Sequence, residues 1–485
     1  MSTKKRVDLN SILQFCNILF AILTIITFNA QGGNEYVNKG TVWLGMGLSA
    51  EIGLFLFFER GRRDPFVLLL CLQMVFYFIF RVLTLTYNPF SVVFLRYPFT
   101  AADLNHALCF IIVSNIVMYL GLSLNRISHK FDEKEISNIQ PRNPYLVIVL
   151  LGIGYFMAFS YLLGFGLSTL VGLLNSLFIN LGIMIFMILV YLILLNKKVP
   201  ARIRYVLIFG VIFFVLFQTL SGSRSAILTM MNYMIFGVLA VYGCIKIKRS
   251  YILIISLLVP VMIVFFLIAT FIRPRLEDRS QVGTETFEVI KEFDFVGTLK
   301  DYAAFVLGPV FDRIGFLDYC AEIMSNADKY EEIFNPKYYV KSIIDNVISP
   351  GFDVFDVPRT SNALKFIYNN EGTPKKSQVD KEGYQSDEFT LYGELYALSG
   401  KWFALIPVFF IGFFSKRLYV KVKDTNKYRF FLKRSFILAT YYGLLNSFGL
   451  DWVALDILGI VFTYYIFKRF FKFYTGNTAE KQFSV

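Results

Sequence analysis

The sequence has few of the residues on which soluble enzymes and secreted proteins depend. Among 485 residues there are two histidines and five cysteines, and charged residues make up 17%, against about a quarter in typical soluble proteins. Five cysteines cannot form a disulfide framework in so long a chain, and four of them lie in apolar runs, namely Cys16, Cys71, Cys109 and Cys244. The low charge and the 56% of hydrophobic residues exclude a disordered, fibrous or ordinary water-soluble protein.

Long apolar runs are what the sequence contains instead. A helix that crosses the hydrocarbon core needs about 20 mostly apolar residues. Twelve runs are candidates, near 11–29, 41–58, 65–85, 104–124, 145–164, 176–195, 205–220, 226–245, 251–272, 402–415, 436–450 and 453–467. We therefore predict an all-α integral membrane protein with about twelve transmembrane helices. We expect the first run to be a retained anchor, because no small-x-small cleavage pattern follows it.

Lysine and arginine are distributed unequally between alternate connections. The tails and connections on one side hold 29 of them, whereas the short connections on the other side hold three, which are Lys39, Arg96 and Arg224. Because cytoplasmic loops retain positive charge, we expect both termini in the cytoplasm. The net charge of +13 is mainly this orientation signal, so we expect no nucleic-acid partner.

One connection is much longer than the rest. Residues 273–401 form an extracytoplasmic loop with 15 basic and 22 acidic residues. The loop separates nine predicted spans in residues 1–272 from three spans and a cytoplasmic tail in residues 402–485. Connections of this length usually have structure and a function of their own.

Apolar residues recur at helical spacing in two parts of this loop. The pattern predicts an amphipathic helix over 299–327, which lies against the bilayer or caps the bundle, and a second helix between 386 and 400. Three prolines predict an irregular stretch over 345–381. We therefore expect one large and partly helical extracytoplasmic loop.

Sequence signatures of soluble enzymes are absent. There is no Walker motif, no Rossmann glycine pattern and no His/Cys spacing typical of a metal site, so we expect no metal and no cofactor. The cytoplasmic connections are too short to build a site for ATP or a nucleotide sugar. We interpret His106, at the outer start of the fourth span, as a structural or solvated histidine.

Arginines at the outer membrane face form the first candidate site. Arg81 lies inside the third span, Arg224 lies in a serine-rich turn, and Arg273 and Arg275 begin the large loop. A charge inside a span is costly, so we expect Arg81 to face a polar cavity or a partner. Guanidinium groups suit a lipid phosphate or pyrophosphate. Two other interpretations stay open: Arg81 extends to the lipid headgroups, and Arg273 and Arg275 anchor the ninth span.

The end of the large loop is the second candidate site. In the segment Ser386–Tyr396, a helix places Tyr392 and Tyr396 on one face and Glu394 near the mouth of the tenth span. A carboxylate there can deprotonate a sugar hydroxyl within hydrogen-bond reach. The alternative interpretation is an aromatic belt with a solvated acidic cap, and the residues themselves favour neither.

In three features the sequence resembles the Wzy-type O-antigen and oligosaccharide repeat-unit polymerases, with the O-antigen ligases as relatives. These features are the turn Ser221–Ala226 (Ser-Gly-Ser-Arg-Ser-Ala), the late extracytoplasmic loop, and the segment Gly393–Tyr396 (Gly-Glu-Leu-Tyr) followed by Gly400. The resemblance rests mainly on topology over most of the chain. The ligases are expected to carry a histidine in the large loop, and residues 273–401 contain none.

The resemblance implies a glycosyltransferase in a bacterial inner membrane. The enzyme would transfer a glycan from undecaprenyl pyrophosphate to the non-reducing end of another lipid-linked repeat unit, on the periplasmic side. The implied residues are Arg224, Arg273, Arg275 and Arg81 for the pyrophosphate, Glu394 or Asp387 for the catalytic base, and Tyr392 and Tyr396 for the glycan. The implied partners are lipid-linked oligosaccharide, membrane lipids and a chain-length-determinant co-polymerase. A flippase for lipid-linked oligosaccharide, or a ligase, remains an alternative.

Overall fold

The computed structural model describes residues 6–59, 64–87, 99–125, 235–243, 245–248, 315–348, 354–369, 374–381, 390–423, 427–446 and 449–451, with single positions at 127, between 201 and 209, and between 453 and 465. In this part of the chain the fold is helical except for one short two-stranded ribbon. The expected fifth, sixth, seventh, ninth and twelfth spans lie wholly or mostly outside the described residues, as does half of the eighth.

Five helices among the described residues are long and apolar enough to cross a membrane. They are α1 (Leu9–Gln31), α2 (Lys39–Phe58), the α3–η1–α4 helix (Pro65–Thr86), α6 (Ala101–Ser123) and the η5–α21 helix (Lys401–Lys421). These helices correspond to the first four expected spans and the tenth. α22 (Lys427–Leu445) covers part of the expected eleventh span but begins earlier. The chain is therefore embedded in a membrane.

Polar caps define where four of these helices begin. The capping residue lies in extended backbone one position before the helix, and its side-chain oxygen accepts a hydrogen bond from an amide of the first turn. The four caps are Asp8, Asn38, Asp64 and Thr100. Such caps satisfy N–H groups that have no partner within the helix. Each of these four apolar runs therefore begins at a local polar signal.

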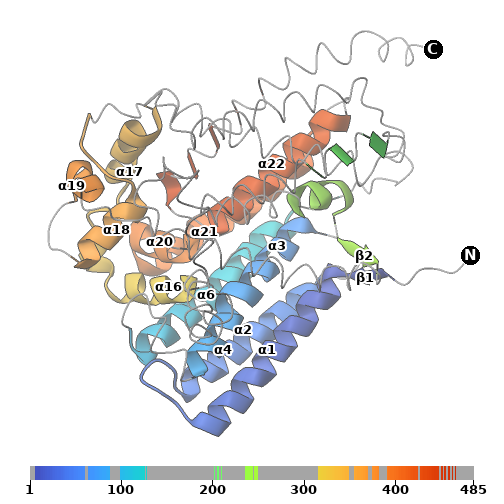
Figure 1. The fold of residues 1–485 in the computed structure, drawn as a ribbon, viewed down its shortest axis with the longest axis horizontal. Coiled ribbons are helices and arrows are strands. Elements are labelled where there is room, and N and C mark those ends of the chain that lie inside the picture. Colours follow the sequence, from blue (N-terminus) through green and yellow to red (C-terminus); the bar gives the residue numbers. More distant parts are fainter. Residues whose placement is uncertain are drawn as a thin grey trace, which may run out of the picture.

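Gly121 and Gly412 bring α6 and α21 into backbone contact where the two helices pack side by side (Figure 1). A Cβ atom at Gly121 would lie 2.3 Å from the carbonyl oxygen of Phe409, and one at Gly412 would lie 2.6 Å from that of Met118. Both distances are shorter than van der Waals contact, so larger side chains cannot occupy these positions. Small residues hold membrane helices together in this way, because lipid provides no hydrophobic drive for helix association.

The third span contains a π-helical turn. η1 (Met74–Ile79) connects α3 (Pro65–Gln73) to α4 (Phe80–Thr86). Turns of this kind change the direction in which the following side chains point, and they are frequent at functional sites. Arg81 is the second residue of α4, so its orientation depends on this turn.

The part of the large loop that the structure describes is helical. It contains α16 (Phe316–Ser325), η3 (Ala327–Tyr330), α17 (Pro336–Ile343), η4 (Ile344–Ile348), α18 (Thr360–Asn369), α19 (Lys376–Lys381) and α20 (Leu391–Ser399). The helix expected between 386 and 400 is confirmed by α20. The expectation of an irregular stretch over 345–381 is wrong at α18 and α19, because Pro358 and Pro374 precede these helices and do not interrupt them. Residues 349–353 and 370–373 of the stretch lie outside the described residues.

The expected amphipathic helix over 299–327 is described only from residue 315 onwards. There α16 differs from a helix at the membrane surface, because its residues from Phe316 to Met324 are all buried. It packs against α6 and α20. The rings of Phe316 and Tyr77 have centroids 4.4 Å apart, and those of Tyr392 and Phe78 have centroids 6.1 Å apart. Since Tyr77 and Phe78 lie in the middle of the third span, α16 and α20 are inserted among the spans (Figure 1).

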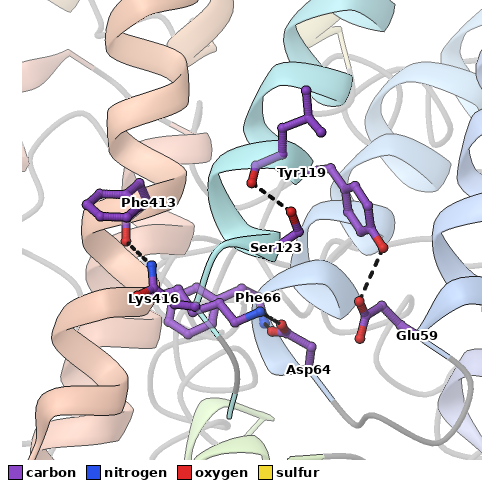
Figure 2. Close-up of polar contacts among 9 residues, drawn as sticks. Glu59, Asp64, Phe66, Tyr119, Ser123, Phe413 and Lys416 are labelled. Atoms are coloured by element: carbon purple, nitrogen blue, oxygen red, sulfur yellow. Dashed lines mark hydrogen bonds and ion pairs between the residues drawn. The ribbon is translucent and has the colours of Figure 1, made fainter.

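A second zone of polar contacts lies at the opposite end of the bundle, where α2 ends and α3 begins. Lys416 of α21 forms a buried ion pair with Asp64, and the Tyr119 hydroxyl of α6 donates to Glu59 at 3.3 Å (Figure 2). At the same end, before α1, β1 (Arg6–Asp8) pairs antiparallel with β2 (Lys246–Lys248). The bundle therefore has polar contacts at both ends, with the loop helices at one of them.

Candidate functional site

The sequence predicts eight site residues, and the structure describes four of them. The described residues, on α4 and α20, are Arg81, Tyr392, Glu394 and Tyr396. The residues that lie outside the described part are Arg224, Arg273, Arg275 and Asp387. The roles of this second group stay predictions.

Arg81 pairs with a carboxylate from the large loop. Its Nε donates to Oδ1 of Asp318 at 2.9 Å, and its Nη2 donates to Oδ2 at 2.5 Å. Both side chains are buried, 1% and 0% exposed. Two parallel bonds of this kind make Arg–carboxylate pairs strong and specific in direction. Arg81 therefore faces a partner, and its guanidinium does not extend to the lipid headgroups.

α20 is held at both of its ends. Thr390 caps the first turn by accepting the N–H of Gly393 at 3.5 Å, and its hydroxyl lies 2.6 Å from the sulfur of Cys320 on α16. Gly393 faces α16, where a Cβ would lie 3.6 Å from Cα of Cys320. At the other end, Gly400 has a left-handed backbone with φ of 75°, which glycine adopts without strain.

Glu394 of α20 is fully buried and accepts two hydrogen bonds on one oxygen. The Tyr339 hydroxyl of α17 donates to Oε1 at 2.5 Å, and the backbone N–H of Leu450 donates to the same atom at 2.8 Å. Burial and then the neighbouring Glu394 carboxyl raise the pKa of Tyr339 well above its ordinary value, so the phenol stays protonated and donates. The interpretation of Glu394 as a solvated acidic cap does not hold.

A second buried carboxyl, Asp451, follows Leu450 directly. Its Oδ2 accepts the Ser342 hydroxyl of α17 at 2.7 Å and the N–H of Thr360 of α18 at 2.9 Å. The segment after α22 therefore binds Glu394 through its backbone and two loop helices through a side chain. No local sequence signal marks Asp451, because its partners lie 109 and 91 residues away along the chain.

Tyr392 and Tyr396 both point towards α6, and both are buried. The Tyr392 hydroxyl donates to Oδ1 of Asn115 at 2.6 Å, and the Tyr396 hydroxyl lies 3.3 Å from Nε2 of His106. The ring of Tyr396 also packs edge-on against Phe110. The two tyrosines therefore connect α20 to a span, and sugar stacking on their rings stays a prediction. The contact made by His106 agrees with its interpretation as a structural histidine.

Three members of the site carried no recognisable signal in the sequence. They are Asp318, Tyr339 and Asn115, whose partners lie 237, 55 and 277 residues away. Each is a polar residue in a helical or apolar run, and such residues occur elsewhere in the chain without these roles. Only the fold brings them to their partners.

The site combines a buried carboxyl, held by two donors, with an Arg–Asp pair where loop helices meet the spans. A carboxyl in a fixed position suits acid–base chemistry or hydrogen bonding with a hydroxyl-rich ligand. Among the described residues, no three His, Cys, Asp or Glu side chains are grouped closely enough to hold a metal ion. In comparisons with known proteins, no family model, curated protein or solved structure matches this chain.

Proposed function

We propose that the chain is a glycan polymerase of a bacterial inner membrane. It transfers a glycan carried on undecaprenyl pyrophosphate to the non-reducing end of another lipid-linked repeat unit, on the periplasmic side. The proposal includes about twelve spans, both termini in the cytoplasm and residues 273–401 in the periplasm. The distribution of basic residues and the resemblance to Wzy-type polymerases support this arrangement.

The observation that carries the proposal is the buried carboxyl of Glu394 on a loop helix inserted among the spans. A lipid-linked donor keeps its pyrophosphate at the membrane face, so the reacting groups must lie there too. Two contacts of α20 support such a position, because Tyr392 ties the helix to α6 and Tyr339 ties Glu394 to the loop. A carboxyl so placed can act on the hydroxyl of an incoming sugar.

In the proposed reaction, the oxygen of the acceptor hydroxyl attacks the anomeric carbon of the donor sugar, and its proton passes to Glu394 or Asp387. The bond from the anomeric carbon to the pyrophosphate oxygen breaks, and undecaprenyl pyrophosphate leaves. Arg224, Arg273 and Arg275 stabilise the charge that develops on the pyrophosphate. Because pyrophosphate is a good leaving group, the reaction needs no nucleotide.

Arg81 takes a different part in this scheme. Its guanidinium is bound to Asp318 by two hydrogen bonds, so we assign it to positioning α16. Arg81 would bind pyrophosphate only where the substrate displaces Asp318. While Asp318 is bound, Arg81 couples the third span to the loop.

Polymerisation by purified protein in liposomes tests the proposal. Given only lipid-linked repeat units, the wild type should form a ladder of glycan lengths, and Glu394→Gln should lose it. Glu322→Gln is the matched control, because Glu322 of α16 is also buried and accepts the Tyr330 phenol at 2.8 Å. Equal ladders from the two variants would exclude Glu394 as the base. A wild type that needs lipid A core as acceptor would be a ligase.

A flippase for the same lipid-linked oligosaccharide is the second candidate. It is favoured by one observation, namely that the third span has a buried ion pair at each end, Asp64–Lys416 and Arg81–Asp318. Transporters alternate by rearranging contacts of this kind. In a deletion strain, single repeat units in the outer leaflet would support the polymerase, and units in the inner leaflet would support the flippase.

A further inference from the structure

Glu51 is a carboxyl in the interior of the spans. It belongs to α2, about 10 Å along the helix axis from the end at Phe58. Its side chain is 7% exposed, and within the described residues neither carboxyl oxygen has a hydrogen-bond donor in bonding geometry. An ionised carboxyl is strongly disfavoured in such a place.

No cation of the described chain compensates Glu51. Among the described residues, the titratable groups that interact with it are the Cys71 thiol of α3 and the Tyr392 hydroxyl of α20, and neither carries a positive charge. Burial is the main cause that raises the pKa of Tyr392 well above its ordinary value, and the Glu51 carboxyl is the second cause. This phenol therefore keeps its proton and remains a hydrogen-bond donor. The buried basic side chains among the described residues are Arg81, Lys416 and Arg434. Each of them contacts a group other than Glu51.

The side-chain amide of Asn115 is the polar group that faces the Glu51 carboxyl. Its Oδ1 accepts the Tyr392 hydroxyl at 2.6 Å, whereas its Nδ2 lies outside hydrogen-bonding geometry with every other described residue. An amide presents a donor beside an acceptor, and a neutral carboxylic acid presents the matching acceptor and donor. An ionised carboxyl can use only the donor. The neutral acid is therefore the form of Glu51 that complements both atoms of the amide.

We propose that Glu51 is a proton-binding site inside the membrane, where it is a neutral acid paired with Asn115 at neutral pH. Through Asn115 and Tyr392 this site is connected to α20, the helix that carries Glu394. Loss of the proton places a charge beside the Asn115 amide, and therefore beside the hydrogen bond of that amide with Tyr392. The position of α20 thereby depends on protonation. The inference goes beyond the polymerase activity and holds independently of it.

Dicyclohexylcarbodiimide tests the proposal, because it reacts with protonated carboxyls in apolar surroundings. In wild-type protein in liposomes at neutral pH, we expect peptide mass spectrometry to locate the reagent on Glu51. The modification should fall as the pH is raised and should be lost in Glu51→Gln. Glu322→Gln, which changes a buried carboxyl of α16, should leave the modification of Glu51 unchanged. Reagent found only at other carboxyls of the wild type would overturn the proposal.

Infrared spectroscopy gives a second readout of the same proton. A neutral acid has a C=O stretching band that an ionised carboxylate lacks, so Glu51→Gln should lose a band that Glu322→Gln retains. Asn115→Leu, which removes the amide that faces the carboxyl, should shift the frequency of this band because the polar surroundings of the acid change. The same spectrum in wild type and Glu51→Gln would overturn the proposal. Labelling of the wild type needs no variant, so a variant that does not fold leaves the test intact.

Discussion

Among single residues, Arg81 and Asp318 make the contact that joins the large loop to the third span. Both charges are almost fully buried, and burial of an unpaired charge is costly. The bidentate geometry compensates for the loss of water by giving each carboxylate oxygen its own donor. Each partner therefore makes burial of the other possible, and α16 can insert among apolar helices.

Removal of one partner of this pair should be far more damaging than removal of both. Arg81→Met leaves Asp318 buried without its cation, and we expect the free energy of unfolding to fall by about 3–5 kcal/mol. The double variant Arg81→Met/Asp318→Leu should recover most of this loss. Denaturant unfolding of the protein in detergent measures the difference. If the single effects simply add, the two residues are not coupled.

Two adjacent tyrosines of α17 separate the role of Glu394 from general packing. Tyr339 donates to Glu394, whereas Tyr338 donates to the carbonyl of Pro358 at 3.0 Å. Because each phenylalanine variant leaves one buried acceptor without its phenol, each should lower stability by about 1–3 kcal/mol. Only Tyr339→Phe should also reduce ladder formation in liposomes, assayed at a temperature where both variants are folded. Equal loss of ladder in both variants would contradict a special role for Glu394.

Cys320 should report whether α16 stays inserted. Burial raises the pKa of its thiol to about 12, so at neutral pH the group holds its proton in the folded protein. Since the thiolate is the reactive form, maleimide should not modify Cys320 until the pH approaches this value or the protein unfolds. Val354→Cys, at a position 62% exposed, should react readily as the control. Modification of Cys320 in folded protein at neutral pH would show that α16 leaves its site.

At the scale of helices, the crossing of α6 and α21 should depend on two glycines. Gly121→Ala and Gly412→Ala place a Cβ at 2.3 and 2.6 Å from backbone oxygens, which are less able to move than side-chain ends. We expect each variant to lose about 1–3 kcal/mol or more of stability, measured by unfolding in detergent. The matched control is Gly53→Ala in α2, where a Cβ meets nothing within 4 Å. A similar loss in the control would mean that the close contact is not responsible, because helix propensity alone favours alanine over glycine.

At the scale of the whole molecule, the loop helices and the Asp64–Lys416 pair lie at opposite ends of the bundle. The proposed orientation puts the first end in the periplasm and the second in the cytoplasm. In a background without native cysteines, Val354→Cys should react with a membrane-impermeant maleimide in intact spheroplasts. Lys423→Cys, at an exposed position just after α21, should react only after permeabilisation. The reverse pattern would invert the orientation.

The sequence by itself determined the features that depend on neighbouring residues. Runs of apolar residues locate the first four spans and the tenth, because burial in lipid depends on the composition of about 20 consecutive residues. Spacing of apolar residues likewise located α20, whose boundaries follow from Thr390 and Gly400. The prolines before α18 and α19 misled the prediction, since proline breaks a helix interior but is compatible with a helix start.

Only the tertiary structure decided which polar groups meet and which are withdrawn from water. Sequence analysis indicated that Arg81 needs a partner, but 237 residues separate it from Asp318. Similarly, Glu394 and Tyr392 acquire their roles from Tyr339, Leu450 and Asn115, which the chain brings to them from three other segments. A buried polar group must be matched in space by a donor or a charge, and proximity in space is a property of the fold that local sequence does not contain.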